Sequence, residues 1–284
     1  MYLGDSMLEL TKEQLRKLQL VELDILKEFD RICKKHSLKY TLCGGTLIGA
    51  IRHDGFIPWD DDIDVAMERD EYEKFIKIQE KELNRKKYYF QSIETDDKYL
   101  KLHSNIRRKN SVYSDITLDK PYKEQGMSID IFPIDKIKNN SIFSKIYYYK
   151  TFILKIILMY KGGYIKSSND KKKNKLVKYI KFISVFYKTK SLKSRVIRRT
   201  KKYNNRNTEY LTCYAGVYGL KEIFNSSHFN KGYTSHIFEN DDFMILTDYD
   251  NYLKHYYGNY MKLPPKDKQI GHHFTGYIKF PDEE

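Results

Sequence analysis

The most informative part of the sequence is the stretch Trp59-Asp60-Asp61-Asp62-Ile63-Asp64-Val65. It places four carboxylates within five positions, next to the only tryptophan of the sequence. Neighbouring carboxylates raise one another's pKa and oppose folding unless a counter-charge is bound. Asp62 and Asp64 alternate with two apolar residues, which is the period of a β-strand with carboxylates on one face. Two such carboxylates can share a hard cation such as Mg²⁺.

A glycine turn comes shortly before the acidic stretch. Residues Tyr40–Cys43 have the composition of a short strand, and Gly44, Gly45 and Thr46 follow at the expected start of a helix. Paired glycines let the backbone approach a ligand closely, and the N–H groups at a helix start favour anions. We therefore predict that this turn holds phosphate oxygens beside the acidic strand.

Basic residues lie near both elements. Arg52 and His53 begin the loop 52–58 that leads into the acidic strand, and they fit either a plain surface position or a counter-charge for phosphate. Residues 101–109 have the pattern of a strand with cationic ends, in which Arg107 is either solvated or fixed near the site. A carboxylate–metal site that handles phosphate needs a fixed cation, and Arg suits bidentate phosphate contact.

A third acid repeats the pattern of the first pair. The alternating apolar stretch Ser128–Asp135 carries Asp130, and the expected strand stops at its proline, Pro133. Taken alone, Asp130 could pair with a cation; on a strand beside Asp62 and Asp64 it would complete a metal site. We predict the metal site, because three carboxylates suit a hard divalent cation.

Composition limits the class of protein. The chain has 284 residues, a formal charge of +14 and 40% hydrophobic residues, which is typical of a globular protein with anionic partners. Its three cysteines have no metal-type spacing and cannot all pair, which favours a reducing compartment. Residues 1–10 contain acids and no apolar run, and no stretch reaches the length of a membrane span, so we expect a cytoplasmic protein without a secretory signal.

The positive charge is concentrated in one segment. Residues 141–206 contain 20 Lys and Arg and one acid, Asp170, a net charge of +19, so the rest of the chain carries −5. Aromatic and aliphatic residues interleave with the lysines, and we predict a helical hairpin or paired helices. Such helices fit either contact with an anionic membrane or polymer, or packing on the core with solvated lysines. No zinc-finger, homeodomain or RNP pattern appears, so we expect no nucleic acid partner.

Periodicity and capping signals predict several further elements. Helices are expected at Lys12–Lys35, opened by a Thr11–Gln14 capping box, at Arg69–Glu82, and at Asp250–Tyr257, closed by Gly258. Residues Tyr88–Ile93 read as a strand. The pair His272-His273 lacks the spacing of a zinc site.

Two blocks of this sequence resemble the signature of the LicD family. The first runs from Gly44 through Arg52-His53 to Asp64, and the second is Ile129–Asp135; weaker similarity resumes at Tyr252–Pro265, with His272 or His273 beyond. Members transfer phosphocholine or related phospho-alcohols from cytidine diphosphate donors onto glycans, and fukutin and fukutin-related protein are relatives that transfer ribitol phosphate. The resemblance covers roughly residues 10–135 and 216–273.

The resemblance implies an α+β fold with a small mixed, nucleotidyltransferase-like sheet flanked by helices. Residues 1–140 would form the catalytic core, 141–210 a basic and mainly helical insert, and 211–284 the part that completes the catalytic domain. It also implies Mg²⁺, with Mn²⁺ as the alternative, held by Asp62, Asp64 and Asp130. Substrate and phosphate contacts are expected from Gly44, Gly45, Thr46, Arg52, His53, Trp59, Asp61, Arg107 and His273, with Asp60 as a further catalytic residue.

The implied reaction moves phosphocholine from CDP-choline to a hydroxyl of a cell-surface glycan and releases CMP. The acceptor would be a teichoic acid, capsule or lipopolysaccharide precursor, free or lipid-linked, at the inner face of the membrane. Trp59 or one of the 26 tyrosines could contact the quaternary ammonium. The alternatives are transfer from CDP-glycerol, CDP-ribitol or CDP-ethanolamine, a nucleotidyltransferase that releases pyrophosphate, and a non-catalytic protein that binds polyanions or membranes.

Overall fold

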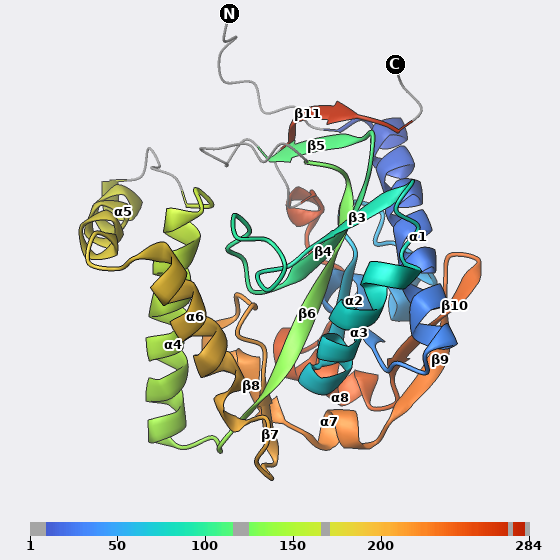
Figure 1. The fold of residues 1–284 in the computed structure, drawn as a ribbon. Coiled ribbons are helices and arrows are strands. Elements are labelled where there is room, and N and C mark those ends of the chain that lie inside the picture. The colour runs from blue at the N-terminus through green and yellow to red at the C-terminus, as the bar shows by residue number, and fades with distance from the viewer. Residues whose placement is uncertain (1–9, 116–124, 166–170, 272–274, 282–284) are drawn as a thin grey trace, which may run out of the picture.

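A mixed β-sheet with helices on both sides forms the centre of the protein (Figure 1). The computed structural model describes residues 10–115, 125–165, 171–271 and 275–281. The α-helices are α1 (Lys12–Lys35), α2 (Gly44–His53), α3 (Arg69–Glu82), α4 (Ile142–Lys161), α5 (Lys171–Ser184), α6 (Thr189–Thr200), α7 (Ser227–Asn230) and α8 (Tyr249–Tyr257). The strands are β1 (Thr41–Leu42), β2 (Asp64–Glu68), β3 (Tyr88–Gln91), β4 (Ser104–Arg108), β5 (Val112–Asp115), β6 (Ser128–Ile137), β7 (Tyr210–Thr212), β8 (Ile223–Asn225), β9 (Tyr233–Phe238), β10 (Asp241–Leu246) and β11 (Thr275–Lys279).

The main sheet has the strand order β1-β2-β6-β4-β3, and β7 and β8 continue it from the far end of β6. Strands β2 and β6 run parallel, whereas the other pairs are antiparallel. The described residues also form two hairpin-like pairs, β9 with β10 and β5 with β11. The predicted α+β class is therefore confirmed. The predicted strand end at Pro133 was wrong: β6 continues to Ile137, because residues beyond the proline pair with β2 and β7.

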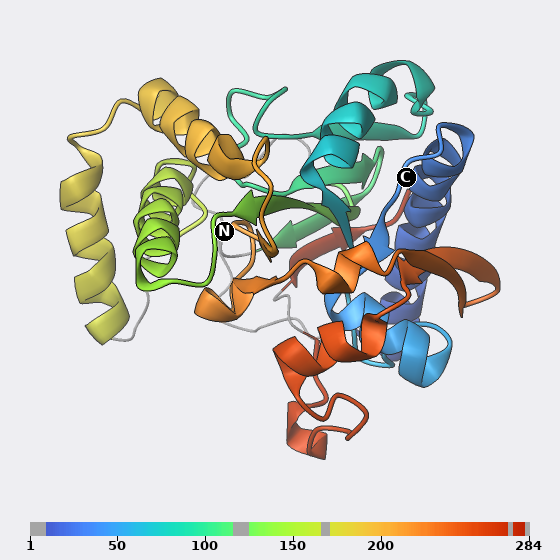
Figure 2. The same cartoon turned by 90° about the horizontal axis from the view of Figure 1, so that it is seen from below.

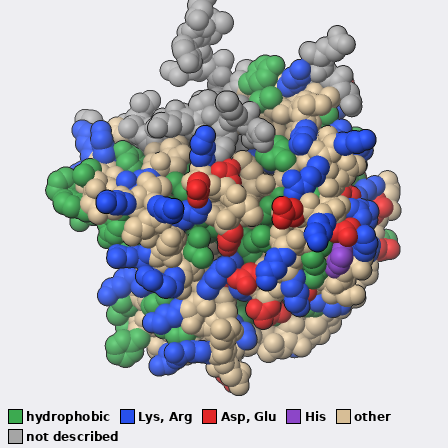
Figure 3. Space-filling view, in the orientation of Figure 1, with side chains coloured by type: hydrophobic (Ala, Val, Ile, Leu, Met, Phe, Trp, Pro, Cys, Tyr) green, Lys and Arg blue, Asp and Glu red, His purple; other side chains and the backbone are tan. Residues whose placement is uncertain are grey.

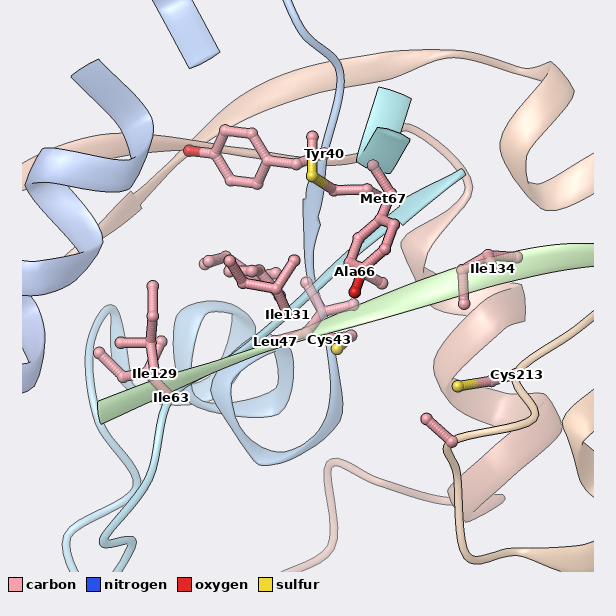
Figure 4. Packing of buried hydrophobic residues seen from close by; sticks show 14 of the residues in the cluster. Tyr40, Cys43, Leu47, Ile63, Ala66, Met67, Ile129, Ile131, Ile134 and Cys213 are labelled. Atoms are coloured by element: carbon pink, nitrogen blue, oxygen red, sulfur yellow. The ribbon is translucent and has the colours of Figure 1, made fainter. Parts of the chain in front are cut away.

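The two faces of the sheet have different surroundings. Helix α3 lies on one side, and α2 and α8 lie on the other (Figures 1 and 2). On the α3 side, buried apolar residues such as Ile63, Val65, Ile129 and Ile131 form the core. Figure 4 shows buried hydrophobic residues around β2 and β6, including Leu47 of α2 and Cys213, which directly follows β7. The alternation puts Asp64 of β2 and Asp130 of β6 on the opposite face.

Several elements begin and end where the sequence signals predict. Helix α1 opens with the reciprocal Thr11–Gln14 capping box and ends at Lys35, α3 spans Arg69–Glu82, and α8 closes at Gly258, whose φ is +65°. A capping box satisfies two N–H groups that the helix itself leaves unpaired, so the start of α1 is fixed locally.

The acidic strand starts later than predicted. Burial alternates as expected from Asp62 to Val65, but β2 begins only at Asp64, and Asp62 lies in the loop before it. The reason is the pairing: β1 is two residues long and reaches only to Val65, and β6 pairs with β2 from Asp64 onward.

The basic segment contains three helices, α4, α5 and α6, whereas the sequence pattern predicted a helical hairpin or paired helices. The prediction therefore missed one helix. Leu192 and Val196, four residues apart and buried, anchor the additional helix α6. Tyr148, Ile157 and Leu158 of α4 belong to the same hydrophobic core as the sheet. The division into 1–140, 141–210 and 211–284 remains a prediction.

Candidate active site

A cavity of about 680 Å³ opens at the carboxylate-bearing face of the sheet. Its walls come from three stretches of the chain, residues 43–66, 101–134 and 213–268. Of the residues predicted for the site, the cavity is lined by Gly44, Gly45, Arg52, Trp59, Asp60, Asp62, Asp64 and Asp130. The structure thus brings most of the predicted residues together.

The centre of the site is a carboxylate pair. Asp64 and Asp130 are direct partners in the parallel β2–β6 register, so their side chains project from the same face of neighbouring strands. Burial raises the pKa of Asp64 well above its ordinary value, and the charges of Asp62, Asp130 and Asp60 raise it further. Because the carboxylates repel one another, the group gains from a bound cation.

Two carboxylates lie close to the glycine turn at the start of α2. Gly44 has a φ of +58°, and a Cβ there would lie 2.9 Å from Oδ2 of Asp64. A Cβ on Gly45 would lie 2.4 Å from Oδ2 of Asp60. The backbone conformation at Gly44 therefore favours glycine, and a side chain at Gly45 would have to displace the carboxylate of Asp60. The first N–H groups of α2 lie beside these carboxylates, at the helix end that favours anions.

Asp130 has neighbours that the sequence did not reveal. Asn105 is its register partner on β4 and donates a hydrogen bond from Nδ2 to Oδ1 of Asp130. Nε2 of His103 lies 3.2 Å from Oδ2 of the same carboxylate. Burial lowers the pKa of His103 to about 4, against the attraction of Asp130, so the imidazole is neutral at pH 7. Asn105 orients the carboxylate through its hydrogen bond, and the neutral imidazole of His103 does not neutralise it.

Thr46 and Asp61 hold the acidic loop in place. The hydroxyl of Thr46 accepts a hydrogen bond from the backbone N–H of Asp64 at 2.8 Å. Oδ2 of Asp61 accepts one from the hydroxyl of Tyr113 at 2.8 Å. Neither residue lines the cavity, and Asp61 is buried. Their predicted contacts with substrate remain predictions.

The predicted basic residues lie in different places. Arg52 lines the cavity and donates hydrogen bonds to Nε2 of His53 and to the carbonyl of Tyr260. Burial and the charge of Arg52 lower the pKa of His53. Arg107 donates to Gln91, to the carbonyl of Gly126 and, at 3.4 Å, to Oδ1 of Asn105, and it is not among the lining residues. His273 lies outside the described residues.

A sixth acid, Glu22, is buried near the acidic loop. Glu22 of α1 is 1% exposed, and among the described residues its Oε2 has no hydrogen-bond partner. Burial raises the pKa of Glu22 well above its ordinary value, and the charges of Asp62, Asp61 and Asp60 add to the effect. In the sequence, Glu22 occupies one position of a long amphipathic helix, and no local signal distinguishes it.

The far wall of the cavity consists of tyrosines. Tyr218, Tyr252, Tyr256, Tyr257 and Tyr260 line the cavity, as does Trp59. The ring centroid of Tyr218 lies 5.7 Å from that of Tyr256 and 5.5 Å from that of Tyr257. Clustered aromatic faces attract cations, quaternary ammonium groups included.

A buried acid and a buried amine support this wall. Glu222 accepts hydrogen bonds from the hydroxyl of Tyr256 and from the backbone N–H of Tyr218. Nζ of Lys155, from α4, donates to the carbonyls of Tyr214, Ala215 and Gly216 at 3.1, 2.8 and 2.8 Å. Burial lowers the pKa of Lys155 to about 8. The basic segment thus fixes a loop that lines the cavity.

The donor set suits a hard cation. Asp62, Asp64 and Asp130 offer carboxylate oxygens alone, and the raised pKa of Asp64 shows that their charges act on one another. In the described part of the chain, no group of three or more His, Cys, Asp or Glu side chains has an arrangement that could hold a metal ion as it stands. The chemistry of these carboxylates nevertheless fits Mg²⁺.

Fold and site together define an α+β protein whose carboxylates, glycine turn and aromatic wall share one cavity. The family model described as "LicD/FKTN/FKRP, nucleotidyltransferase domain" matches residues 37–156. The lipopolysaccharide cholinephosphotransferase LicD of Haemophilus influenzae is 33% identical over 262 residues, which cover 90% of this chain and 94% of that protein. The chain belongs to the LicD family.

A second relative is similar over a shorter region. An uncharacterised protein of Rickettsia prowazekii, RP689, is 32% identical over 123 residues, which cover 42% of this chain and 46% of that protein. Since the Haemophilus influenzae protein is aligned along nearly its whole length, the similarity to it extends over both the acidic strand and the tyrosine wall.

Proposed function

We propose that the protein transfers phosphocholine from CDP-choline to a hydroxyl group of a cell-surface glycan and releases CMP. Its family and its similarity to a lipopolysaccharide cholinephosphotransferase support transfer of a phospho-alcohol to a glycan. The observation that carries the choline assignment is the cavity itself, where the proposed metal ligands Asp62, Asp64 and Asp130 and a wall of tyrosines line one space.

Mg²⁺ held by Asp62, Asp64 and Asp130 would neutralise the charge of the donor's diphosphate, as phosphoryl transfer requires. The residues of the chain supply the positioning. The N–H groups at the start of α2, at Gly44 and Gly45, lie beside the same carboxylates and suit phosphate oxygens.

The remaining lining residues have complementary roles. Arg52 is the predicted cation that lines the cavity, and it would stabilise charge on the departing CMP. Asp60 lies against the glycine turn and is the candidate base for the acceptor hydroxyl. Tyr218, Tyr256 and Tyr257 would surround the trimethylammonium group by cation–π attraction.

The direct test is incubation of the protein with a panel of CDP-alcohols, Mg²⁺ and an acceptor glycan. The panel contains CDP-choline, CDP-ethanolamine, CDP-glycerol and CDP-ribitol, and the products are separated as CMP and phosphorylated glycan. We expect CMP from CDP-choline above the other donors. Preference for CDP-ribitol or CDP-glycerol would disprove the choline assignment, and release of pyrophosphate from CTP would indicate a nucleotidyltransferase instead.

The carboxylate assignment has its own test. Asp64→Asn keeps the size of the side chain but removes its charge, so we expect turnover to fall by about 10³-fold or more, as with other electrostatic groups at reaction centres. The fold should be retained or slightly stabilised, because a carboxylate with a raised pKa is lost. Asp70→Asn, at an exposed position in the first turn of α3, is the matched control. An active Asp62→Asn/Asp64→Asn double variant would contradict the assignment.

A further inference from the structure

One edge of the molecule exposes an unusual amount of apolar surface. Of the eighteen large hydrophobic side chains that are exposed in the described residues, ten lie on or just after α4 and α5. They include Phe143 at 79%, Phe182 at 64% and Phe186 at 72% exposure. Figure 3 shows hydrophobic and basic side chains together at the left edge, where Figure 1 places these two helices. Exposed apolar surface on this scale indicates a contact site.

The exposed and buried residues of α4 form two separate stripes. Ile142, Ile146, Tyr149 and Ile153 are exposed, and Ser144, Tyr148, Thr151 and Lys155 are buried. Each set repeats at intervals of four, three and four residues, so each occupies one face of the helix. The two sets are offset by two residues, about half a turn, and therefore lie on opposite faces. One face of α4 packs on the core, and the other has no covering element among the described residues.

Helix α5 shows the same pattern with more lysines. Leu176, Tyr179 and Phe182 are exposed at intervals of three residues, and Phe186 follows just beyond the helix. Exposed basic residues accompany this stripe on α5, in the following turn and at the start of α6, namely Lys175, Lys178, Lys181, Lys188 and Lys190. The whole segment 141–206 has a net charge of +19. An apolar stripe edged by lysines is complementary to a surface that is anionic outside and apolar beneath.

The helices can lie on such a surface without crossing it. Within the described residues, no helix has the length and apolar character needed to span a membrane. We propose that the exposed faces of α4 and α5 dock on the surface of an anionic lipid bilayer. Aromatic and aliphatic side chains enter the boundary between headgroups and acyl chains, and the lysines contact anionic headgroups.

Docking would bring the cavity close to the bilayer. Lys155, on the buried face of α4, holds the loop 214–216 that lines the cavity, and the exposed stripe lies on the other side of the same helix. The two are separated by about one helix diameter, 10–12 Å. If the proposed function is correct, this surface serves an acceptor that is itself attached to lipid; the docking is independent of that function.

Vesicle binding tests the docking and requires no donor substrate. We expect the full chain to co-sediment with phosphatidylglycerol-containing vesicles and not with pure phosphatidylcholine vesicles, and to dissociate at high salt. The double variant Ile153→Ser/Phe182→Ser should lower vesicle affinity by about tenfold or more at an unchanged melting temperature. Ile237→Ser/Tyr277→Ser, which changes exposed apolar residues on β9 and β11, is the matched control and should bind like wild type.

Tryptophan fluorescence reports the depth of insertion. Trp59 is the only tryptophan, so a Trp59→Phe background is silent. In that background Phe182→Trp should shift its emission to the blue on anionic vesicles, and Ile237→Trp should not. Equal binding to neutral and anionic vesicles, or unchanged binding of the double variant, would overturn the proposal. A dimer that the double variant abolishes, without vesicle binding, would assign the surface to a second copy of the chain.

Discussion

At the scale of single residues, the site depends on the register between two strands. Asp64 and Asp130 are 66 positions apart in sequence and become partners because β2 and β6 pair in parallel at these residues. The alternation of apolar and acidic residues in the sequence identifies Asp64 and Asp130 separately, because the residues on either side of each one are apolar and buried. The sequence does not identify Asn105 or His103 beside Asp130, because that contact depends on the pairing of β4 with β6.

Glu22 provides a stability test that does not depend on activity. Its pKa is raised well above 4.5, so between 4.5 and the raised value the folded protein holds a proton that the unfolded chain has lost. The free energy of unfolding of the wild type should therefore fall as pH rises through this interval, by about 1.4 kcal/mol per pH unit from this group. Glu22→Gln does not titrate, so the variant should become increasingly more stable than wild type.

Urea denaturation in the presence of a chelator, repeated across that pH range, measures the difference. Glu80→Gln on the exposed side of α3 is the control, because the same change there affects no buried side chain. A difference between Glu22→Gln and wild type that stays constant with pH would show that the carboxyl group is not held protonated by its surroundings.

At the scale of elements, the helices with local signals were predicted best. The capping box of α1 and the glycine after α8 mark ends that depend on neighbouring residues only. The start of strand β2 was predicted too early, because it depends on where β1 and β6 pair with the strand. Helix α6 was missed, because it is recognised mainly by two buried residues. The tyrosine wall combines residues from α8 and from loops on both sides of it, so no single pattern reveals it.

Helix α4 links the basic segment to the cavity, and Lys155 is the residue to test. Lys155→Met should lower the free energy of unfolding by about 1–3 kcal/mol, because three buried carbonyls lose their donor. Lys150→Met, at an exposed position of the same helix, should change it by about 0.5 kcal/mol or less. Thermal and urea unfolding of the two variants give the comparison.

The same pair of variants distinguishes a structural from a positioning role. If Lys155 holds the loop 214–216 in its place on the cavity wall, Lys155→Met should also raise KM for CDP-choline, with a smaller effect on kcat. Equal stability and equal KM in the Lys155 and Lys150 variants would mean that the carbonyls find other donors.

At the scale of the whole molecule, the binding of a metal should appear as stability. If Mg²⁺ binds only the folded protein, a hundredfold excess over Kd adds about 2.7 kcal/mol to the free energy of unfolding. The Asp62→Asn/Asp130→Asn variant should lose this gain. Because the pKa of Asp64 is raised, protons compete with the metal, and the gain should increase as pH rises.

Melting temperatures with Mg²⁺, with Mn²⁺ and with a chelator, at several pH values, provide the measurement. Loss of the gain in the double variant alone would support the three-carboxylate assignment. An equal gain in wild type and variant would place the metal elsewhere on the protein.

The separation of the cavity walls along the chain has a consequence for synthesis on the ribosome. The stretches 43–66 and 101–134 emerge first, and the tyrosine wall within 213–268 emerges near the end. A nascent chain can pair β2 with β6 while the space in front of Asp64 and Asp130 is still open to water. Ligand contacts that need both the carboxylates and the tyrosine wall can form only after the C-terminal part has been made. A ribosome that stalls before residue 213 would therefore hold a sheet with its carboxylates in register but without a complete substrate pocket.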